Sequence, residues 1–132
     1  MKIISKILFL VILVFLIFSC DSLCGNYILF TKNIKDTEYK IVVFERDCGA
    51  TTGFSTQASI LKINEDLPNE PGNIFTSNTD HGKAPSGKGG GPELRVSVLD
   101  NNHIQLAYHE YASIGLCENM YKNIKISYIT FK

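Results

Sequence analysis

The chain has 132 residues, with 13 basic and 13 acidic side chains and a formal net charge of zero. This length suits one domain rather than two. The balanced charge gives no electrostatic footprint for nucleic acid, so nucleic-acid binding is not expected.

The first residues have the pattern of a bacterial export signal. Lys2 and Lys6 precede an uncharged apolar run, Ile7 to Phe18. A run of this length is too short for a membrane-spanning helix, which needs about 20 apolar residues, but it fits the h-region of a signal peptide. We therefore predict a signal peptide over residues 1–19 and one mature domain over residues 20–132.

The signal ends in Ile17-Phe18-Ser19-Cys20, which resembles a lipobox, the sequence cut by lipoprotein signal peptidase. An aliphatic residue stands three before the cysteine and a small residue directly before it, although Phe18 departs from the usual pattern. We predict that Cys20 is acylated and anchors the protein to a membrane of the bacterial cell envelope, with the leaflet open. The alternative is ordinary cleavage with Cys20 as a structural thiol, which Ile17 suits poorly.

Strand-like runs dominate the mature chain, and helical periodicity is scarce. Segment Ala112–Lys122 suits either a helical turn or a loop. Because short turns join sequential strands, we predict an all-β domain of seven to eight short antiparallel strands, arranged as a small sandwich or barrel. The predicted strands are Gly25–Thr31, Tyr39–Arg46, Thr56–Ile63, Asn73–Thr76, Leu94–Leu99, His103–Tyr111 and Asn123–Phe131.

Three of these runs alternate apolar and polar residues, which is typical of strands with one buried face. Asp100-Asn101-Asn102 separates two of them and predicts a tight turn. The residues expected on the buried faces are Leu94, Val96 and Val98, then Ile104, Leu106 and Tyr108, then Ile124, Ile126 and Tyr128.

Segment 77–92 is rich in Gly, Ser, Pro and Asn and has few apolar residues. We predict a flexible loop there. Within it, Gly82 to Gly89 imitates a phosphate-binding P-loop. A genuine P-loop needs Ser or Thr after the lysine and a helix behind it, whereas Gly89 follows Lys88 and Pro92 comes soon after. No nucleotide partner is therefore expected.

The four cysteines are at positions 20, 24, 48 and 117. Acylation of Cys20 would leave three, so that one is unpaired. A hairpin folded about residue 36 would place Cys24 opposite Cys48, within disulfide reach. The pairs Cys24–Cys117 and Cys48–Cys117 remain alternatives.

Residues Arg46 to Ile60 read Arg-Asp-Cys-Gly-Ala-Thr-Thr-Gly-Phe-Ser-Thr-Gln-Ala-Ser-Ile. This stretch resembles a signature in an uncharacterised family of small bacterial lipoproteins and secreted proteins, in which it joins two strands. The earlier Cys24-Gly25 and the later Gly72-Asn73-Ile74-Phe75 are also similar to that pattern. The resemblance implies export and a Cys24–Cys48 disulfide, and it implies no particular activity.

The same stretch is our candidate binding loop. Its hydroxyl groups and Asp47 have no histidine nearby to act as a base, so catalytic residues are not predicted. We expect Gly49 and Gly53 to allow tight backbone, Arg46 to pair with Asp47, and Phe54 to project as an aromatic anchor for a partner. The candidate residues are Arg46, Asp47, Thr51, Thr52, Phe54, Ser55 and Gln57.

The three histidines do not form a metal-binding pattern. His103 and His109 would lie on one strand about 20 Å apart, and His81 lies in the predicted loop. We predict no metal and no cofactor.

These observations favour a non-enzymatic binding module, such as an immunity or inhibitor protein, which is held at a membrane by its lipid anchor. The expected partner is an envelope protein or a toxin. The alternative is an envelope hydrolase or another enzyme with an unrecognised site.

Overall fold

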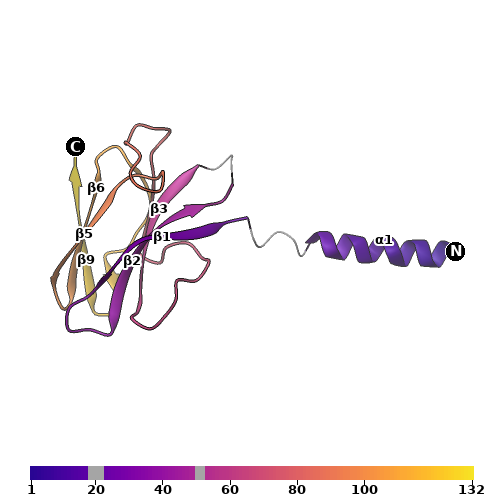
Figure 1. The fold of residues 1–132 in the computed structure, drawn as a ribbon, viewed down its shortest axis with the longest axis horizontal. Coiled ribbons are helices and arrows are strands. Elements are labelled where there is room, and N and C mark those ends of the chain that lie inside the picture. The colour runs from indigo at the N-terminus through magenta and orange to yellow at the C-terminus, as the bar shows by residue number, and fades with distance from the viewer. Residues whose placement is uncertain (18–22, 50–52) are drawn as a thin grey trace.

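The computed structural model describes residues 1–17, 23–49 and 53–132. An apolar helix, α1 (Lys2–Ile17), covers most of the predicted signal peptide (Figure 1). Within the described ranges, no helix is both long enough and apolar enough to cross a membrane.

The rest of the described chain forms nine strands in two sheets, which pack face to face as a β-sandwich (Figure 1). The first sheet has the order β1-β2-β3-β4-β7, and the second has the order β5-β6-β9-β8. The predicted mainly β fold is therefore confirmed. The strands are β1 (Gly25–Asn33), β2 (Tyr39–Asp47), β3 (Phe54–Lys62), β4 (Phe75–Asn78), β5 (Leu94–Asp100), β6 (His103–His109), β7 (Ser113–Cys117), β8 (Met120–Tyr121) and β9 (Ile124–Phe131).

Two details of the predicted topology are wrong. Strands β6 and β9 pair in parallel, whereas every pairing was expected to be antiparallel. The cause lies in segment 112–122, which forms β7 and β8 rather than a helical turn or a loop. The chain leaves the second sheet after β6, adds β7 to the first sheet, and returns to place β9 beside β6 in the same direction. These strands also raise the total above seven or eight.

The main core fills the space between the sheets, and the alternating residues of β5, β6 and β9 point into it as predicted. Strands β2 and β3 also bury their outer face, where Val42, Phe44 and Leu61 pack with Leu67 from the following loop. Both faces of these two strands are therefore covered, which explains the uninterrupted apolar run from Ile41 to Phe44 in β2.

The predicted hairpin disulfide is confirmed, with Cys24 Sγ and Cys48 Sγ 2.03 Å apart. One extra residue in β1, Leu29, lies between the pairs Ile28–Phe44 and Phe30–Val43. This β-bulge shifts the register by one residue, and Gly25 then pairs with Asp47 next to the disulfide. Among the cysteines that the structure describes, Cys117 is free and exposed.

The segment predicted as a loop is more closely packed than its composition suggests. It begins inside β4, Ala84 is buried, and a bridge joins Ser86 to Pro92. Gly91 is also buried, because it lies against Thr56 of β3. The segment leads into β5 and not into a helix. Its flexibility stays a prediction.

Candidate functional site

The described part of the candidate binding loop covers the end of β2 and the start of β3, beside the Cys24–Cys48 disulfide. Thr51, Thr52 and the predicted lipidation site Cys20 fall outside the described residues. Gly49 and Gly53 have φ angles of 112° and 67°, which are left-handed conformations that suit the tight backbone expected there.

Arg46 does not pair with Asp47, contrary to our prediction. Its Nη1 donates to Asn26 Oδ1 at 2.7 Å and to Asn69 Oδ1 at 3.2 Å. Asn69 in turn donates to the carbonyl of Cys24 at 2.8 Å. Asp47 instead accepts a hydrogen bond from the backbone N–H of Gly49 at 2.9 Å. Arg46 thus holds the loop after β3 against the start of β1.

Gln57 and Ser55 are also engaged within the fold. The buried Gln57 amide donates to Ser55 Oγ at 2.9 Å and accepts from the backbone N–H of Gly72 at 2.7 Å. Ser55 Oγ donates to the Arg46 carbonyl at 3.3 Å. These two side chains hold neighbouring segments together, so their polar atoms are already occupied.

Phe54 is 47% exposed, and one side of its ring is covered by Gly90. It therefore projects only in part. A shallow cavity of about 230 Å³ adjoins it. The described residues that line this cavity are Arg46, Cys48, Gly53, Phe54, Ser55, Gln57 and Asn78.

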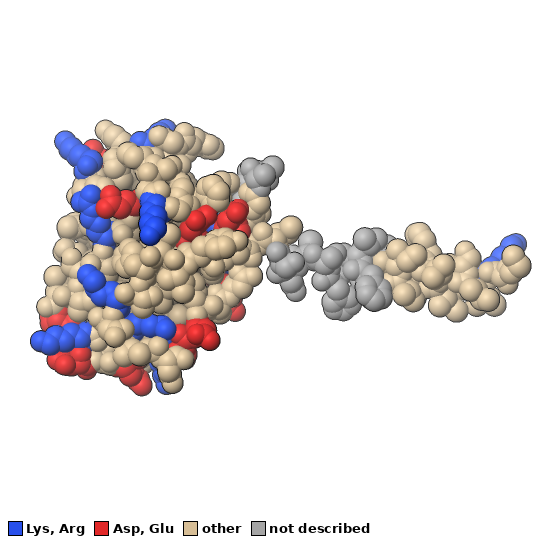
Figure 2. Space-filling view, viewed as in Figure 1, with Lys and Arg blue, Asp and Glu red and all other residues tan. Residues whose placement is uncertain are grey.

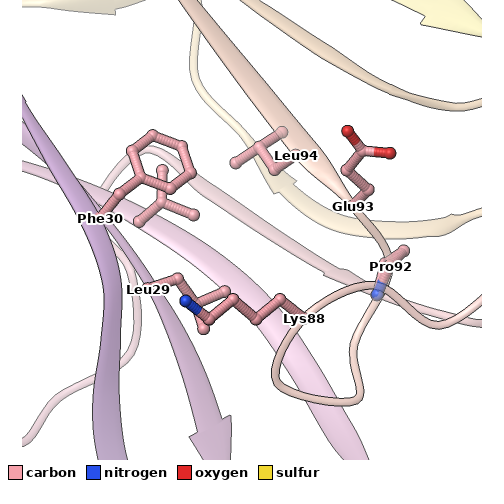
Figure 3. Close-up of a pocket in the computed structure, with 7 residues that line it drawn as sticks. Leu29, Phe30, Lys88, Pro92, Glu93 and Leu94 are labelled. Atoms are coloured by element: carbon pink, nitrogen blue, oxygen red, sulfur yellow. The ribbon is translucent and has the colours of Figure 1, made fainter.

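A larger cavity of about 310 Å³ opens at the edge of the sandwich, between β1 and the start of β5 (Figure 3). We call it the edge pocket. Its lining is mainly apolar, and Val43 at the back belongs to the main core. The lining residues are Leu29, Phe30, Val43, Lys88, Pro92, Glu93 and Leu94.

The β-bulge contributes to this pocket. Leu29 packs against the main core, and Phe30 pairs with Val43. As a result, Leu29 and Phe30 are consecutive residues that both line the cavity. Phe30 remains 37% exposed. Our sequence analysis missed the pocket. A signal was nevertheless present, because Tyr27 to Phe30 are four consecutive apolar residues and not the alternating pattern of a strand with one exposed face.

The two charged residues of the edge pocket, Lys88 and Glu93, differ in their polar contacts. Glu93 accepts hydrogen bonds from Arg95 at 2.7 and 3.2 Å, and this contact lowers the pKa of the Glu93 carboxyl. In Figure 3 the Lys88 side chain extends toward Leu29, whereas the Glu93 carboxylate points away from it. Across the described chain, Lys88 takes part in no ion pair. Its ammonium group is therefore available to a ligand.

A polar contact between strands also escaped the sequence analysis. His103 Nε2 lies 2.8 Å from Ser127 Oγ, because β6 and β9 run side by side. A catalytic Ser–His pair needs a third group to orient the histidine. No hydrogen bond to Nδ1 of His103 is present among the described residues. Ser127 also lies 3.4 Å from the carbonyl of Ile104.

The rest of the surface has a mixed character. On the face shown in Figure 2, basic and acidic side chains are interspersed. Around a cavity on the second sheet, the Arg95 guanidinium stacks on the Phe131 ring, 3.9 Å from its centroid, and His109 contacts the same ring. No group of three or more His, Cys, Asp or Glu side chains converges within the described part of the chain.

Comparison with known protein families, with curated proteins and with solved structures found no match for this chain. The edge pocket and the candidate binding loop are therefore interpreted from their own geometry.

Proposed function

We propose that this protein is an exported, lipid-anchored binding module of the bacterial envelope, and that its binding site is the edge pocket. The observation that carries the proposal is an apolar cavity that opens between the sheets, with an unpaired lysine at its mouth. Ligand sites in proteins are typically concave and apolar, with a few placed polar groups.

The partner that we propose is another envelope protein, such as a toxin or an enzyme to be inhibited. An apolar side chain of this partner would enter the pocket between Phe30 and Leu94, and a carboxylate beside it would pair with Lys88. Phe30 is 37% exposed, so part of its ring is left uncovered for this contact. In protein interfaces, a few well-packed residues near the centre commonly contribute most of the binding energy.

Site-specific photo-crosslinking of the full chain in living cells would test this proposal. p-Benzoylphenylalanine is placed at position 30 and, as a control, at position 99, where Leu99 is 51% exposed on β5. We expect one discrete protein adduct from position 30 and none from position 99. Lys88→Glu should weaken that adduct at least fivefold, since it reverses the charge that faces the partner.

Three outcomes would overturn the proposal in different ways. Equal adducts from both positions would remove the edge pocket as the site. Adducts to lipid alone would remove the protein partner. A soluble, unacylated wild-type protein would contradict the proposed lipid anchor. Fractionation of the wild type and of Cys20→Ala tests this directly.

A further inference from the structure

We infer that the end of the sandwich that carries the Cys24–Cys48 disulfide contacts the lipid headgroups of the membrane. We call this surface the disulfide end and define it by Leu23, Tyr27 and Phe54. The inference rests on the proposed acylation of Cys20 and adds a second contact with the same membrane, which is separate from the edge pocket.

The first argument is the length of chain between the anchor and the domain. Four peptide steps join Cys20 to Cys24, and a fully extended chain spans at most about 3.6 Å per step, or about 14 Å in total. The disulfide then fixes Cys24 to the residue that follows β2. Cys24, and with it the disulfide, therefore cannot move farther than this from an acylated Cys20, which would lie at the surface of the hydrocarbon layer.

The second argument is the exposed apolar surface at this end. Leu23 is 70% exposed, Tyr27 is 61% exposed and Phe54 is 47% exposed. Phe54 pairs with Asp47, which pairs with Gly25 on its other side, so Phe54 lies one residue from the level of the disulfide. The Tyr27 ring leans back over Gly25, since a Cβ built there would be 3.5 Å from ring atoms.

Side chains of these types suit a headgroup layer. Tyrosine is enriched at membrane interfaces because its ring is apolar and its hydroxyl is polar. The polar headgroup region is about 5–8 Å deep on each side of a bilayer. Even a fully extended tether of about 14 Å leaves Cys24 no more than about 6–9 Å outside that region, so the rings remain close enough to enter it.

Charge attraction does not drive the proposed contact. Glu45 and Asp47 lie on the same face of β2, near the disulfide end, and carry no ion pair within the described part of the chain. These carboxylates would be repelled by anionic lipids. We therefore expect the contact to form on zwitterionic lipid and to be insensitive to salt.

The chain contains no tryptophan, so a single indole can report on one position. Phe54→Trp places it at the disulfide end. Leu99→Trp is the matched control, because Leu99 is exposed and lies beyond the Lys32–Val96 contact, toward the opposite end of the sandwich. The acylated full chain is reconstituted into phosphatidylcholine vesicles that contain a nitroxide-headgroup phosphatidylcholine. We expect at least twofold stronger fluorescence quenching of Phe54→Trp than of Leu99→Trp, at both low and high salt.

Flotation with the vesicles separates failure of the anchor from failure of the inference. Equal quenching of the two variants in protein that floats would overturn the contact and leave the anchor intact, and so would stronger quenching of Leu99→Trp. Protein that does not float would overturn both. If Phe54→Trp does not fold, Tyr27→Trp gives the same readout from β1.

Discussion

The backbone of Gly90 lies directly against the ring of Phe54, so that a Cβ built at position 90 would stand 2.6 Å from Cδ2 of that ring. The next residue is equally close to β3, because a Cβ at Gly91 would be 2.7 Å from the backbone nitrogen of Thr56. Two consecutive glycines thus allow this segment to lie flat on the sheet and to cover one side of Phe54.

Gly91→Ala should destabilise the domain, since the added methyl group meets backbone atoms that cannot move aside. Overpacking of this kind costs about 1–3 kcal/mol, which corresponds to a fall in melting temperature of roughly 4–12 °C for a domain of this size. Gly25→Ala is the matched control, because its nearest contact is 3.5 Å away. A similar fall for both variants in thermal unfolding would contradict the packing described for Gly91.

Removal of the disulfide should lower the free energy of unfolding. The bond joins residues 24 apart in sequence, and closing a loop of this length is worth about 3 kcal/mol in the chain-entropy account. The variant with both Cys24→Ser and Cys48→Ser should therefore unfold at a clearly lower urea concentration. Cys117→Ser, which removes an exposed free thiol, should change the midpoint little. Peptide mapping without reduction should also yield a fragment that joins the segments around Cys24 and Cys48.

Lys32 should contribute more to the free energy of unfolding than an exposed lysine does. Its Nζ donates to the Val96 carbonyl at 2.8 Å in a partly buried contact between the two sheets. Lys32→Met keeps the aliphatic stem but leaves that carbonyl without this donor, at a cost of about 1–2 kcal/mol. Lys40→Met is the control, because Lys40 Nζ makes its bond of 2.9 Å to the Ile63 carbonyl in an exposed position. An equal decrease in the free energy of unfolding for the two variants, measured with urea, would contradict the larger contribution expected of Lys32.

Two carboxylates should give pH effects of opposite sign. Burial raises the pKa of the Glu45 carboxyl, and repulsion from Asp47 raises it further. The folded chain then holds this proton more tightly, so stability falls as the pH rises from the unfolded pKa of about 4.3 through the raised value. Glu45→Gln should therefore raise the melting temperature at neutral pH and have little effect at about pH 3.5, where the carboxyl is protonated in both states.

For Glu93, the hydrogen bond from Arg95 lowers the pKa of the carboxyl. Its contribution to stability is present above the unfolded pKa and is lost as the pH falls through the lowered value. Glu93→Gln should accordingly lower the melting temperature at neutral pH, with a loss that disappears in acid. Melting curves at several pH values check both variants, and shifts of the same sign would contradict this assignment.

The parts of the fold that could be predicted from sequence are those that depend on neighbouring residues. The alternation of Leu94, Val96 and Val98 predicted which face of β5 is buried, and the turn near residue 36 placed Cys24 opposite Cys48. The parallel pairing of β6 with β9 could not be predicted in this way, because it depends on β7 joining the other sheet. Nothing in the short run Ser113–Cys117 specifies which sheet it joins.

In the candidate site, too, some features depend on neighbouring residues and others on residues far apart in the sequence. The positive φ angles of Gly49 and Gly53 follow from local chemistry. The partner of Arg46 does not, since Asn26 and Asn69 reach it from 20 and 23 residues away. The edge pocket combines a bulge in β1 with residues 59 or more positions later in the chain. Its existence depends on how far apart the two sheets settle, and no single segment encodes that spacing.

The position of β9 has a consequence for the order of folding. This strand is the last in the sequence, yet it lies between β6 and β8 in the second sheet. A chain that is synthesised from its N-terminus can form the β1–β2–β3 meander early, whereas the second sheet lacks an inner strand until residues 124–131 have been made. Completion of the sandwich is thus delayed until the strand from residue 124 to residue 131 is available, and before that the second sheet has no strand to join β6 to β8.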